Sequence, residues 1–424
     1  MSEVEKAKIT RRKYLKYGGA VVAVGVAAAA GYGIYEATKP PVKKEIVIGG
    51  TLPLTGICAM DGQRILRATE LAVNRINEEG GVLGKKLRLI VYDDTMAAEK
   101  IGPLYEKLIA TDKVDILITP YGAPMAFPAL TVCEKYDKIM IAGFVASTSP
   151  AQRFGGKNGF FAHCMPRPTY SSFYYSIFTD MLNDFDKWNY KKEFTLDKTV
   201  ASINENQLWG IEQHEIWKPM AEKQGWNMVL DEFVDITAVE FSSTLAKIKL
   251  TKPFLILAEF FFFRCVILLK QMIEQGVSAP FVVLGEAGTS YDWIDPEKGV
   301  GPVGNGIFTI NLFPKDYRGG DSEYLRAKYK ELYGTIPSAH EVTGYSSIEI
   351  IRDAVEKAGS LESDALRKVL LTEEFDTCFT RVKFDKEGCN TLWEPTAGQW
   401  QNNVIETVWP PKRATAKPIY PYSP

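Results

Sequence analysis

The spacing of hydrophobic positions changes repeatedly between residues 45 and 165, from short apolar runs to a helical repeat and back. Apolar residues three and four positions apart predict helices, which we place at 61–79, 99–111 and 125–136. Short apolar or alternating runs predict strands, which we place at 46–50, 87–92, 114–119 and 139–143. Strands separated by helices of this size predict right-handed βαβ units on a parallel sheet.

The same alternation starts again near residue 199. It predicts strands at 199–203, 227–234, 254–258 and 281–284 and helices at 210–224, 241–250 and 264–275. Later residues predict helices at 321–333 and 346–358 and a pair of antiparallel strands at 381–388 and 398–408. Two βα series of similar length predict the α/β class, with two doubly wound parallel-sheet lobes.

Composition supports a two-lobed globular protein. The chain has 424 residues, 46% hydrophobic and 24% charged, which is too long for one compact core. Beyond residue 44 there are 41 basic and 49 acidic residues, and this mildly acidic body argues against nucleic acid as a partner. The chain has three histidines, none with zinc-ligand spacing, so we expect no metal site.

The N-terminus has the pattern of a targeting segment. A basic stretch at 10–16, TRRKYLK, precedes an uncharged, apolar run at 18–35. This order is typical of an export signal or a single membrane anchor, and the paired arginines resemble a twin-arginine signal. The alternative is a buried N-terminal helix. We assign 1–44 to a signal or anchor plus linker, and expect contact with a membrane only through 18–35.

No catalytic motif is present. The chain has no phosphate-binding G-x-x-x-x-G-K-[ST] sequence, no G-x-S-x-G and no H-E-x-x-H, and the glycines at 49–50 lack dinucleotide-binding spacing. We therefore expect no enzyme activity and no cofactor. The histidines are interpreted as surface or satisfied core residues: His163, His214 and His340.

Four short segments carry a family resemblance. INEEGGVLGKKLRL at 76–89, followed by DD at 93–94, resembles the signature of extracellular solute-binding proteins of the leucine/isoleucine/valine-binding type. Three more segments agree with that family in the same order: LPLTG at 52–56, ASTSP at 146–150 and VKFDKEG at 382–388. The resemblance covers residues 45 to about 410.

The resemblance implies a type I periplasmic-binding-protein fold, in which three crossovers join the two lobes. We place the crossovers near Pro166, Ile310 and Cys378. Lobe 1 would then comprise 45–165 and 311–378, and lobe 2 would comprise 166–310 and 379–424. Cys378 and Cys389 either form a disulfide or stay unpaired.

The implied function is an exported receptor that captures a small-molecule ligand by hinge closure. The ligand would be a branched-chain amino acid, an amide or a related aromatic compound, and the partner would be the permease of an ABC importer. The alternative is the ligand-sensing ectodomain of a signalling system.

The location of the site follows from the strands alone. Ligands bind beyond the carboxyl ends of strands in an open parallel sheet. This rule selects segments 56–61, 121–125 and 144–148 in lobe 1, and 204–209, 260–263 and 286–288 in lobe 2.

The resemblance assigns roles within these segments. Ala123 stands where the family has a carboxylate-binding serine, so only its backbone N–H remains. In the family the next turn binds the ligand through a carbonyl and a threonine hydroxyl; here Ser147 or Thr148 stands in that turn, with Ala146 nearby. Trp209 and either Phe260 or Phe261 are the expected aromatic contacts, and Glu286 would meet a ligand ammonium group.

Several alternatives stay open at this point. Tyr121 and Phe144 would add aromatic area to the cleft. Each phenylalanine at 260–263 either reaches the cleft or packs against the sheet. Glu286 is either a ligand contact or a solvated loop charge, and Asp61 is either a second cleft acid or the N-cap of its helix.

Overall fold

A computed structural model of the chain describes residues 44–56, 58–145, 147–162, 173–184, 196–288, 290–394 and 396–423. Within it, Ile46–Pro424 form one compact unit that contains two large sheets. The expected export signal or anchor, including 18–35, and the expected crossover near Pro166 lie outside the described residues. No helix in the described ranges combines the length and the apolar character that a membrane span needs.

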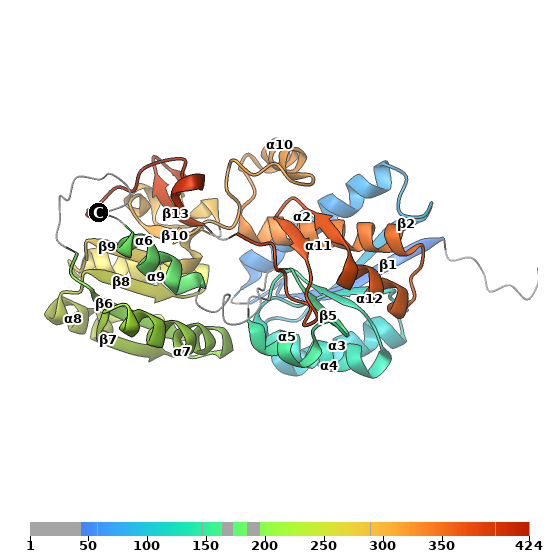
Figure 1. Cartoon of the computed structure of the whole chain (residues 1–424), viewed down its shortest axis with the longest axis horizontal. Coiled ribbons are helices and arrows are strands. Elements are labelled where there is room, and N and C mark those ends of the chain that lie inside the picture. The colour runs from blue at the N-terminus through green and yellow to red at the C-terminus, as the bar shows by residue number, and fades with distance from the viewer. Residues whose placement is uncertain are drawn as a thin grey trace, which may run out of the picture. The chain divides into compact units, whose positions relative to one another are not determined.

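The first sheet has five strands in the order β2-β1-β3-β4-β5 (Figure 1). Its strands are β1 (Glu45–Leu52), β2 (Lys86–Asp93), β3 (Ile116–Ile118), β4 (Met140–Ala142) and β5 (Gly159–Phe161). The β1–β3, β3–β4 and β4–β5 pairs are parallel. The sheet lies between two helical layers. One layer holds α2 (Ala59–Glu78), α11 (Ala339–Ala358) and α12 (Ser363–Thr372), and the other holds α3 (Ala98–Ala110), α4 (Ala123–Tyr136) and α5 (Thr148–Phe154).

The second sheet has seven strands in the order β14-β13-β10-β9-β8-β6-β7. Its parallel strands are β6 (Thr199–Glu205), β7 (Asn227–Val234), β8 (Leu255–Glu259), β9 (Phe281–Leu284) and β10 (Phe308–Ile310). A terminal antiparallel hairpin extends it, made of β13 (Ala397–Gln401) and β14 (Val404–Trp409). Its helices are α6 (Phe173–Asn183), α7 (Leu208–Lys223), α8 (Ser242–Thr251) and α9 (Phe262–Glu274), and α10 (Ser322–Tyr333) follows β10.

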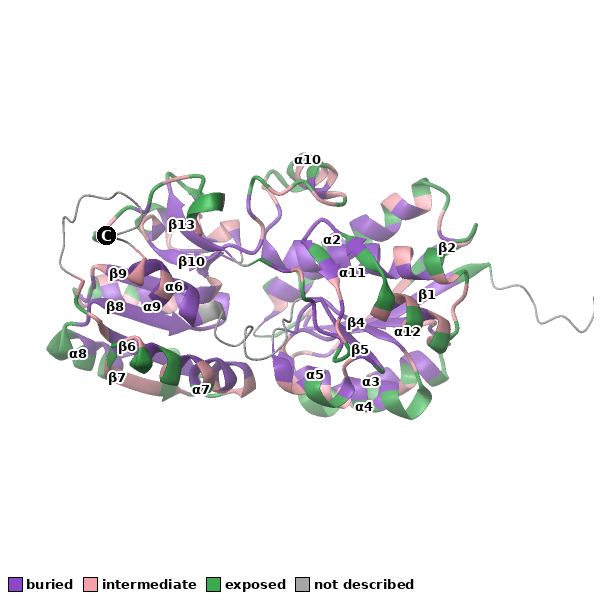
Figure 2. Ribbon diagram, viewed as in Figure 1, coloured by how far each residue is buried: buried purple, intermediate pink, exposed green. Residues whose placement is uncertain are grey.

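Alternation along the strands explains why the second sheet has a helical layer on each face. Leu255 and Leu257 of β8 belong to the same hydrophobic cluster as Trp217 of α7. The intervening Ile256 packs instead in a second cluster with Leu268 of α9. Successive side chains of a strand point to opposite faces, so an entirely apolar strand must be covered on both sides. Figure 2 shows the resulting burial of β6 and β8.

The two sheets repeat one topology. In each sheet, the first parallel strand along the chain lies in the interior of the sheet. β1 lies between β2 and β3 in the order β2-β1-β3-β4-β5, and β6 lies between β7 and β8 in the order β7-β6-β8-β9-β10. The strand order reverses between β1 and β3 and again between β6 and β8, which creates a crevice at the carboxyl ends of these strands. The expected α/β class with two doubly wound parallel-sheet lobes is confirmed.

The late strands differ from the prediction. Arg381–Lys383 (β12) pairs with Glu374–Asp376 (β11) and not with residues 398–408. The segment after β12 also packs on the first sheet: Cys389 bridges to Phe161, and the rings of Phe160 and Phe384 lie 5.4 Å apart. The chain therefore joins the second sheet near residue 396, beyond the crossover expected at Cys378. The lobe boundaries as domains stay a prediction.

No disulfide joins Cys378 to Cys389. Both side chains are buried. Cys378 Sγ lies 3.5 Å from the carbonyl oxygen of Val342 on α11, while Cys389 lies at the bridge to Phe161. The predicted hairpin that would have brought the two cysteines together is absent, because β12 pairs with β11.

Glu349 of α11 holds two chain segments that are distant in the sequence, at Asp321 and at Cys378. Its carboxylate accepts the backbone N–H of Asp321 at 2.9 Å and that of Cys378 at 2.7 Å. Burial raises the pKa of this carboxyl from its ordinary 4.5 to about 7. A raised carboxyl pKa stabilises the fold at low pH, and that contribution is lost as the pH rises through about 7.

We therefore expect the Glu349→Gln variant to gain stability relative to the parent chain as the pH rises from 4.5 to 8. The expected gain is about 3 kcal/mol, from a shift of about two and a half pKa units. Urea unfolding across this range measures it, with Glu356→Gln, an exposed position on the same helix, as the control. A difference between Glu349→Gln and the parent that does not vary with pH would contradict the assignment.

Candidate functional site

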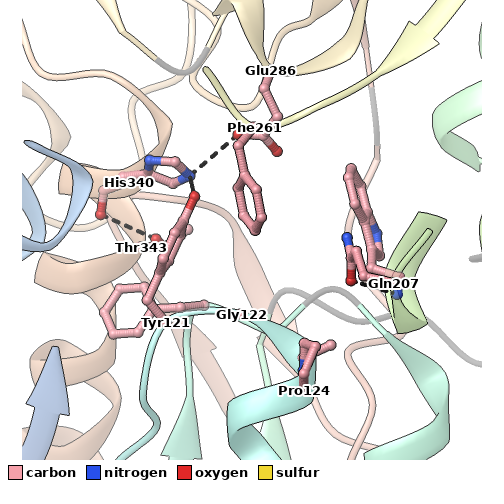
Figure 3. Close-up of a pocket in the computed structure, with 11 residues that line it drawn as sticks. Tyr121, Gly122, Pro124, Gln207, Phe261, Glu286, His340 and Thr343 are labelled. Atoms are coloured by element: carbon pink, nitrogen blue, oxygen red, sulfur yellow. Dashed lines mark hydrogen bonds and ion pairs between the residues drawn. The ribbon is translucent and has the colours of Figure 1, made fainter. Parts of the chain in front are cut away.

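A cavity lies at the carboxyl ends of the strands of both sheets (Figure 3). Each lining segment follows a strand, except for two residues near the start of α11. The loops after β3 and β4 contribute from lobe 1, and those after β6, β8 and β9 contribute from lobe 2. The lining residues are Tyr121, Gly122, Ala123, Pro124, Phe144, Gln207, Trp209, Phe261, Glu286, His340 and Thr343.

Aromatic and apolar groups form most of the cavity wall. Tyr121 and Phe144 of lobe 1 and Phe261 of lobe 2 belong to one hydrophobic cluster. The ring centroids of Tyr121 and Phe261 lie 5.8 Å apart, with the ring planes tilted by 46°. Trp209, at the start of α7, is also buried. This wall suits a ligand with an apolar or flat group.

His340 contacts a carboxylate of each lobe at one side of the cavity. Its contacts with Glu286 and Tyr121 are drawn in Figure 3. Its Nε2 lies 3.5 Å from an oxygen of Glu286 and 3.4 Å from the hydroxyl of Tyr121, and its Nδ1 lies 3.5 Å from Asp61. Burial alone would lower the pKa of His340, but Asp61, Glu286 and Glu341 outweigh it and raise that pKa above the usual value. The imidazole therefore lies between acids of both lobes, and these acids favour its charged form.

Arg64 connects the same group of charges to lobe 2. Its guanidinium lies 3.4 Å from Asp61 and forms a close ion pair with Asp292. Both Arg64 and Asp61 are buried, so these charges interact with little screening by water.

A second contact between the lobes lies at the turn after β4. Glu212 of α7 accepts close hydrogen bonds from the hydroxyls of Ser147 and Thr148, and another from the backbone N–H of Thr148 at 3.0 Å. The hydroxyl of Ser149 donates to the same carboxylate at 3.2 Å. Glu212 is 5% exposed. A carboxylate of the protein itself thus satisfies the donors of this turn.

A buried ion pair supports the lobe 2 side of the cavity. Arg264 and Glu205 have no exposed side-chain surface, and Arg264 Nη1 lies 2.6 Å from a Glu205 oxygen. Glu205 also accepts the backbone N–H of Phe261 at 3.1 Å. Burial raises the pKa of Glu205 despite the opposing charge of Arg264. The pair fixes the position at which the chain enters α9, and with it the ring of Phe261.

Six of the residues singled out from the sequence line the cavity: Tyr121, Ala123, Phe144, Trp209, Phe261 and Glu286. Ser147 and Thr148 lie beside it and bind Glu212. Ala146 lies outside the described residues. Their roles toward a ligand stay predictions.

Two positions differ from the expectations. Phe260 does not line the cavity: it is fully buried in lobe 2 and stacks on Phe241 with ring centroids 5.4 Å apart. Phe260 packs in the hydrophobic cluster of lobe 2, whereas Phe261, the N-cap of α9, packs with Tyr121 and Phe144. The N-cap interpretation of Asp61 is also wrong, since Cys58 is the N-cap and Asp61 lies in the first turn of α2. Asp61 instead contacts His340 and Arg64.

Gln207 lies within the segment 204–209 that the strand rule selects, although no role is predicted for it. His340, Thr343 and the supporting Glu212 lie outside all the selected segments. His340 and Thr343 lie in the first turns of α11, which the apolar pattern placed as starting at residue 346. Residues 339–351 of this helix are all buried, so they show no alternation of polar and apolar faces. Gly344 permits this burial, because a Cβ there would lie 2.9 Å from the hydroxyl of Thr69 on α2.

Comparison with known proteins decides the family. The family model described as "Periplasmic binding protein" matches residues 45–394. The chain belongs to this family. The four short segments predicted a protein of the leucine/isoleucine/valine-binding type, and this prediction is confirmed.

Similar proteins cover nearly the whole described chain. Leu/Ile/Val-binding protein homolog 7 of Brucella suis biovar 1 (strain 1330) is 25% identical over 363 residues, covering 82% of this chain and 87% of the relative. The substrate-binding protein of a branched-chain amino acid transporter from Streptococcus pneumoniae, solved with isoleucine, superposes with a TM-score of 0.73 at 18% identity, covering 89% and 100% of the two chains.

A third similar protein was solved with an aromatic acid. The solute-binding protein of an ABC transporter from R. palustris, in complex with benzoate, superposes with a TM-score of 0.74 at 18% identity, covering 86% of this chain and 95% of that one. At this level of identity the two solved structures establish the fold. The type I periplasmic-binding-protein fold expected for the chain is confirmed.

Proposed function

We propose that this periplasmic binding protein is the extracytoplasmic substrate-binding component of an ABC importer. It captures a small solute in the cavity between its lobes and delivers it to the permease. The observation that carries the proposal is the cavity itself, to which loops at the carboxyl ends of strands in both sheets contribute. Its similarity to the substrate-binding protein of a branched-chain amino acid transporter from Streptococcus pneumoniae, and to the solute-binding protein of an ABC transporter from R. palustris, supports it.

Capture proceeds by hinge closure. The cavity has a volume of about 50 Å³, room for only a few water molecules. A solute of amino-acid size therefore enters when the lobes separate, and contacts both lobes only when they come together again. Because the ligand binds the closed arrangement more strongly, it shifts the population toward that arrangement, which the permease then recognises.

The proposed ligand contacts are the cavity-lining residues. Tyr121, Phe144, Trp209 and Phe261 provide apolar area, while Glu286 and His340 provide polar groups. The backbone at Ala123 lies at the start of α4. An export signal within 1–44 would place the protein outside the cytoplasm, where such capture takes place.

Thermal shift and isothermal titration of the full chain test the proposal. The panel is leucine, isoleucine, benzoate, benzamide, leucinamide, urea, benzylamine and isopentylamine. We expect at least one compound to bind with a Kd below about 1 mM and to raise the melting midpoint. No binder in the panel, at millimolar concentrations, would count against a solute-binding role.

A further inference from the structure

We infer that the cavity selects a small organic ammonium compound with an apolar or aromatic body and rejects carboxylates, with Glu212 and Glu286 as the specificity-determining residues. This inference rests on the proposed function and narrows it. Three observations carry it: the occupation of the turn after β4, the balance of charge around the cavity, and the composition of its wall.

The first observation is the placement of Glu212. Ser147, Thr148 and Ser149 all donate to its two carboxylate oxygens, and Glu212 is buried there. The loop that carries these donors also carries Phe144, which lines the cavity. A ligand carboxylate that sought these donors would have to displace a buried carboxylate already bound by four of them. Charge-assisted hydrogen bonds are the stronger kind, so this displacement is unfavourable.

The other donors near the cavity suit a carboxylate poorly. At the start of α4, where the family resemblance places a ligand carboxylate, only the backbone N–H of Ala123 remains: alanine has no hydroxyl and Pro124 has no backbone N–H. The hydroxyl of Thr343 donates to the carbonyl oxygen of His340 at 3.1 Å. Among the described residues, none that lines the cavity is a lysine or an arginine. A carboxylate would therefore enter without a partner of opposite charge other than His340, which lies between Asp61 and Glu286.

The second observation is an excess of negative charge. The groups that act on His340 and Arg64 are the carboxylates of Asp61, Glu286, Asp292 and Glu341. Four carboxylates thus surround one imidazole and one guanidinium, and the exposed Lys298, 3.6 Å from Asp292, is a third cation on the outer side. Glu286 is the carboxylate that lines the cavity directly. A cation in the cavity restores the balance, whereas an anion increases the repulsion.

The third observation is the wall. Tyr121, Trp209 and Phe261 present aromatic rings to the cavity. Aromatic faces attract an organic cation and also bury its apolar body, and the effect is strongest where water is excluded. An ammonium group directed at Glu286, with an aliphatic or aromatic body between these rings, uses every feature of the site.

Two matched pairs of compounds test the inference by isothermal titration of the full chain. Isopentylamine is leucine without its carboxylate, and benzylamine is benzoate with an aminomethyl group in place of the carboxylate. We expect the amine to bind at least tenfold more tightly than its partner in one or both pairs. Equal or tighter binding of leucine and benzoate overturns the inference but leaves the solute-binding function intact. If none of the four binds, leucinamide is compared with leucine instead, because it has the ammonium group and apolar body without a carboxylate: binding of leucinamide supports the inference, and binding of only isoleucine, benzamide or urea overturns it. A panel without any binder removes both the inference and the solute-binding function.

Variants at the two glutamates distinguish their roles. Glu212→Ala should release the donors of Ser147 and Thr148 and raise the affinity for leucine or benzoate at least tenfold. Glu286→Gln should lower the affinity for the amine at least tenfold. Glu215→Ala, at an exposed position on the same helix as Glu212, should change neither affinity.

The melting midpoint of each variant shows whether it folds. Glu212→Gln keeps one acceptor oxygen for the same donors, and it replaces Glu212→Ala if the latter does not fold. An unchanged preference between amine and carboxylate in a folded Glu212 variant overturns the role assigned to this residue. An unchanged affinity for the amine in Glu286→Gln overturns the role of Glu286.

Discussion

Replacing Arg264 with methionine is expected to lower the free energy of unfolding by about 3 to 5 kcal/mol, because it leaves Glu205 buried without its cation. The two side chains have no exposed surface and lie 2.6 Å apart, and the guanidinium also lies over the ring of Phe260 at 4.5 Å. Water cannot reach Glu205 to compensate for the lost charge. Urea or thermal unfolding of the full chain measures the effect.

The pH dependence of this variant has a defined sign. Without Arg264, the folded-state pKa of Glu205 rises further above its unfolded value, since burial already raises it. The carboxyl must then become protonated in the folded state, so the variant loses more stability at pH 8 than at pH 5.

A double variant separates charge from packing. Glu205→Gln together with Arg264→Met removes both charges and should be more stable than Arg264→Met alone. Arg381→Met breaks an exposed ion pair with Glu374, 2.6 Å apart, and should leave the melting midpoint almost unchanged. A single Arg264 variant as stable as the parent chain, or a double variant less stable than the single one, would contradict this account of the pair.

The largest expected effect on binding comes from the two aromatic residues that lobe 2 presents to the cavity. Trp209→Ala and Phe261→Ala are each expected to weaken binding of the tightest panel compound roughly 30- to 100-fold, about 2 to 3 kcal/mol. Both side chains are buried at the cavity wall, at 7% and 8% exposure. Truncation removes apolar contact with the ligand and lets water in. Isothermal titration of each variant measures the change.

Phe233→Ala is the matched control. Phe233 is a half-exposed aromatic residue on β7 of the same lobe and is not among the residues that line the cavity. Its removal should leave the affinity unchanged. If the two cavity variants fold and bind as tightly as the parent chain, the ligand does not occupy this cavity.

Much of the fold could be predicted because its local signals agree with its tertiary structure. The pattern predicts the strands at 227–234 and 281–284 with the observed bounds, since each is apolar or alternating and ends at a turn. The pattern predicts the helix at 61–79 within two residues of the bounds of α2, because one face of this helix is apolar. The rule for open parallel sheets then selected the loops that bear Tyr121, Phe144 and Phe261.

What the sequence did not predict depends on contacts between distant segments. The pairing of β12 with β11 is decided by packing against the first sheet, and residues 381–388 carry no local signal that excludes the other partner. The first turns of α11 are buried on every side, so the sequence there shows no alternation of polar and apolar positions. The pattern therefore does not predict that His340 lies on a helix. Glu212 could not be predicted for a related reason. A glutamate on a helix is normally solvated, and only its contact with Ser147, which is distant in the sequence, makes it part of the site.

The central claim is that a solute binds between the two lobes and contacts both. The most direct measurement is a crystal structure of the full chain with the tightest-binding compound of the panel. The account predicts density for the compound between Tyr121 of lobe 1 and Trp209 and Phe261 of lobe 2, with a polar group within hydrogen-bonding distance of Glu286. Density for the compound at another surface, with this cavity still closed around its own side chains, would contradict it.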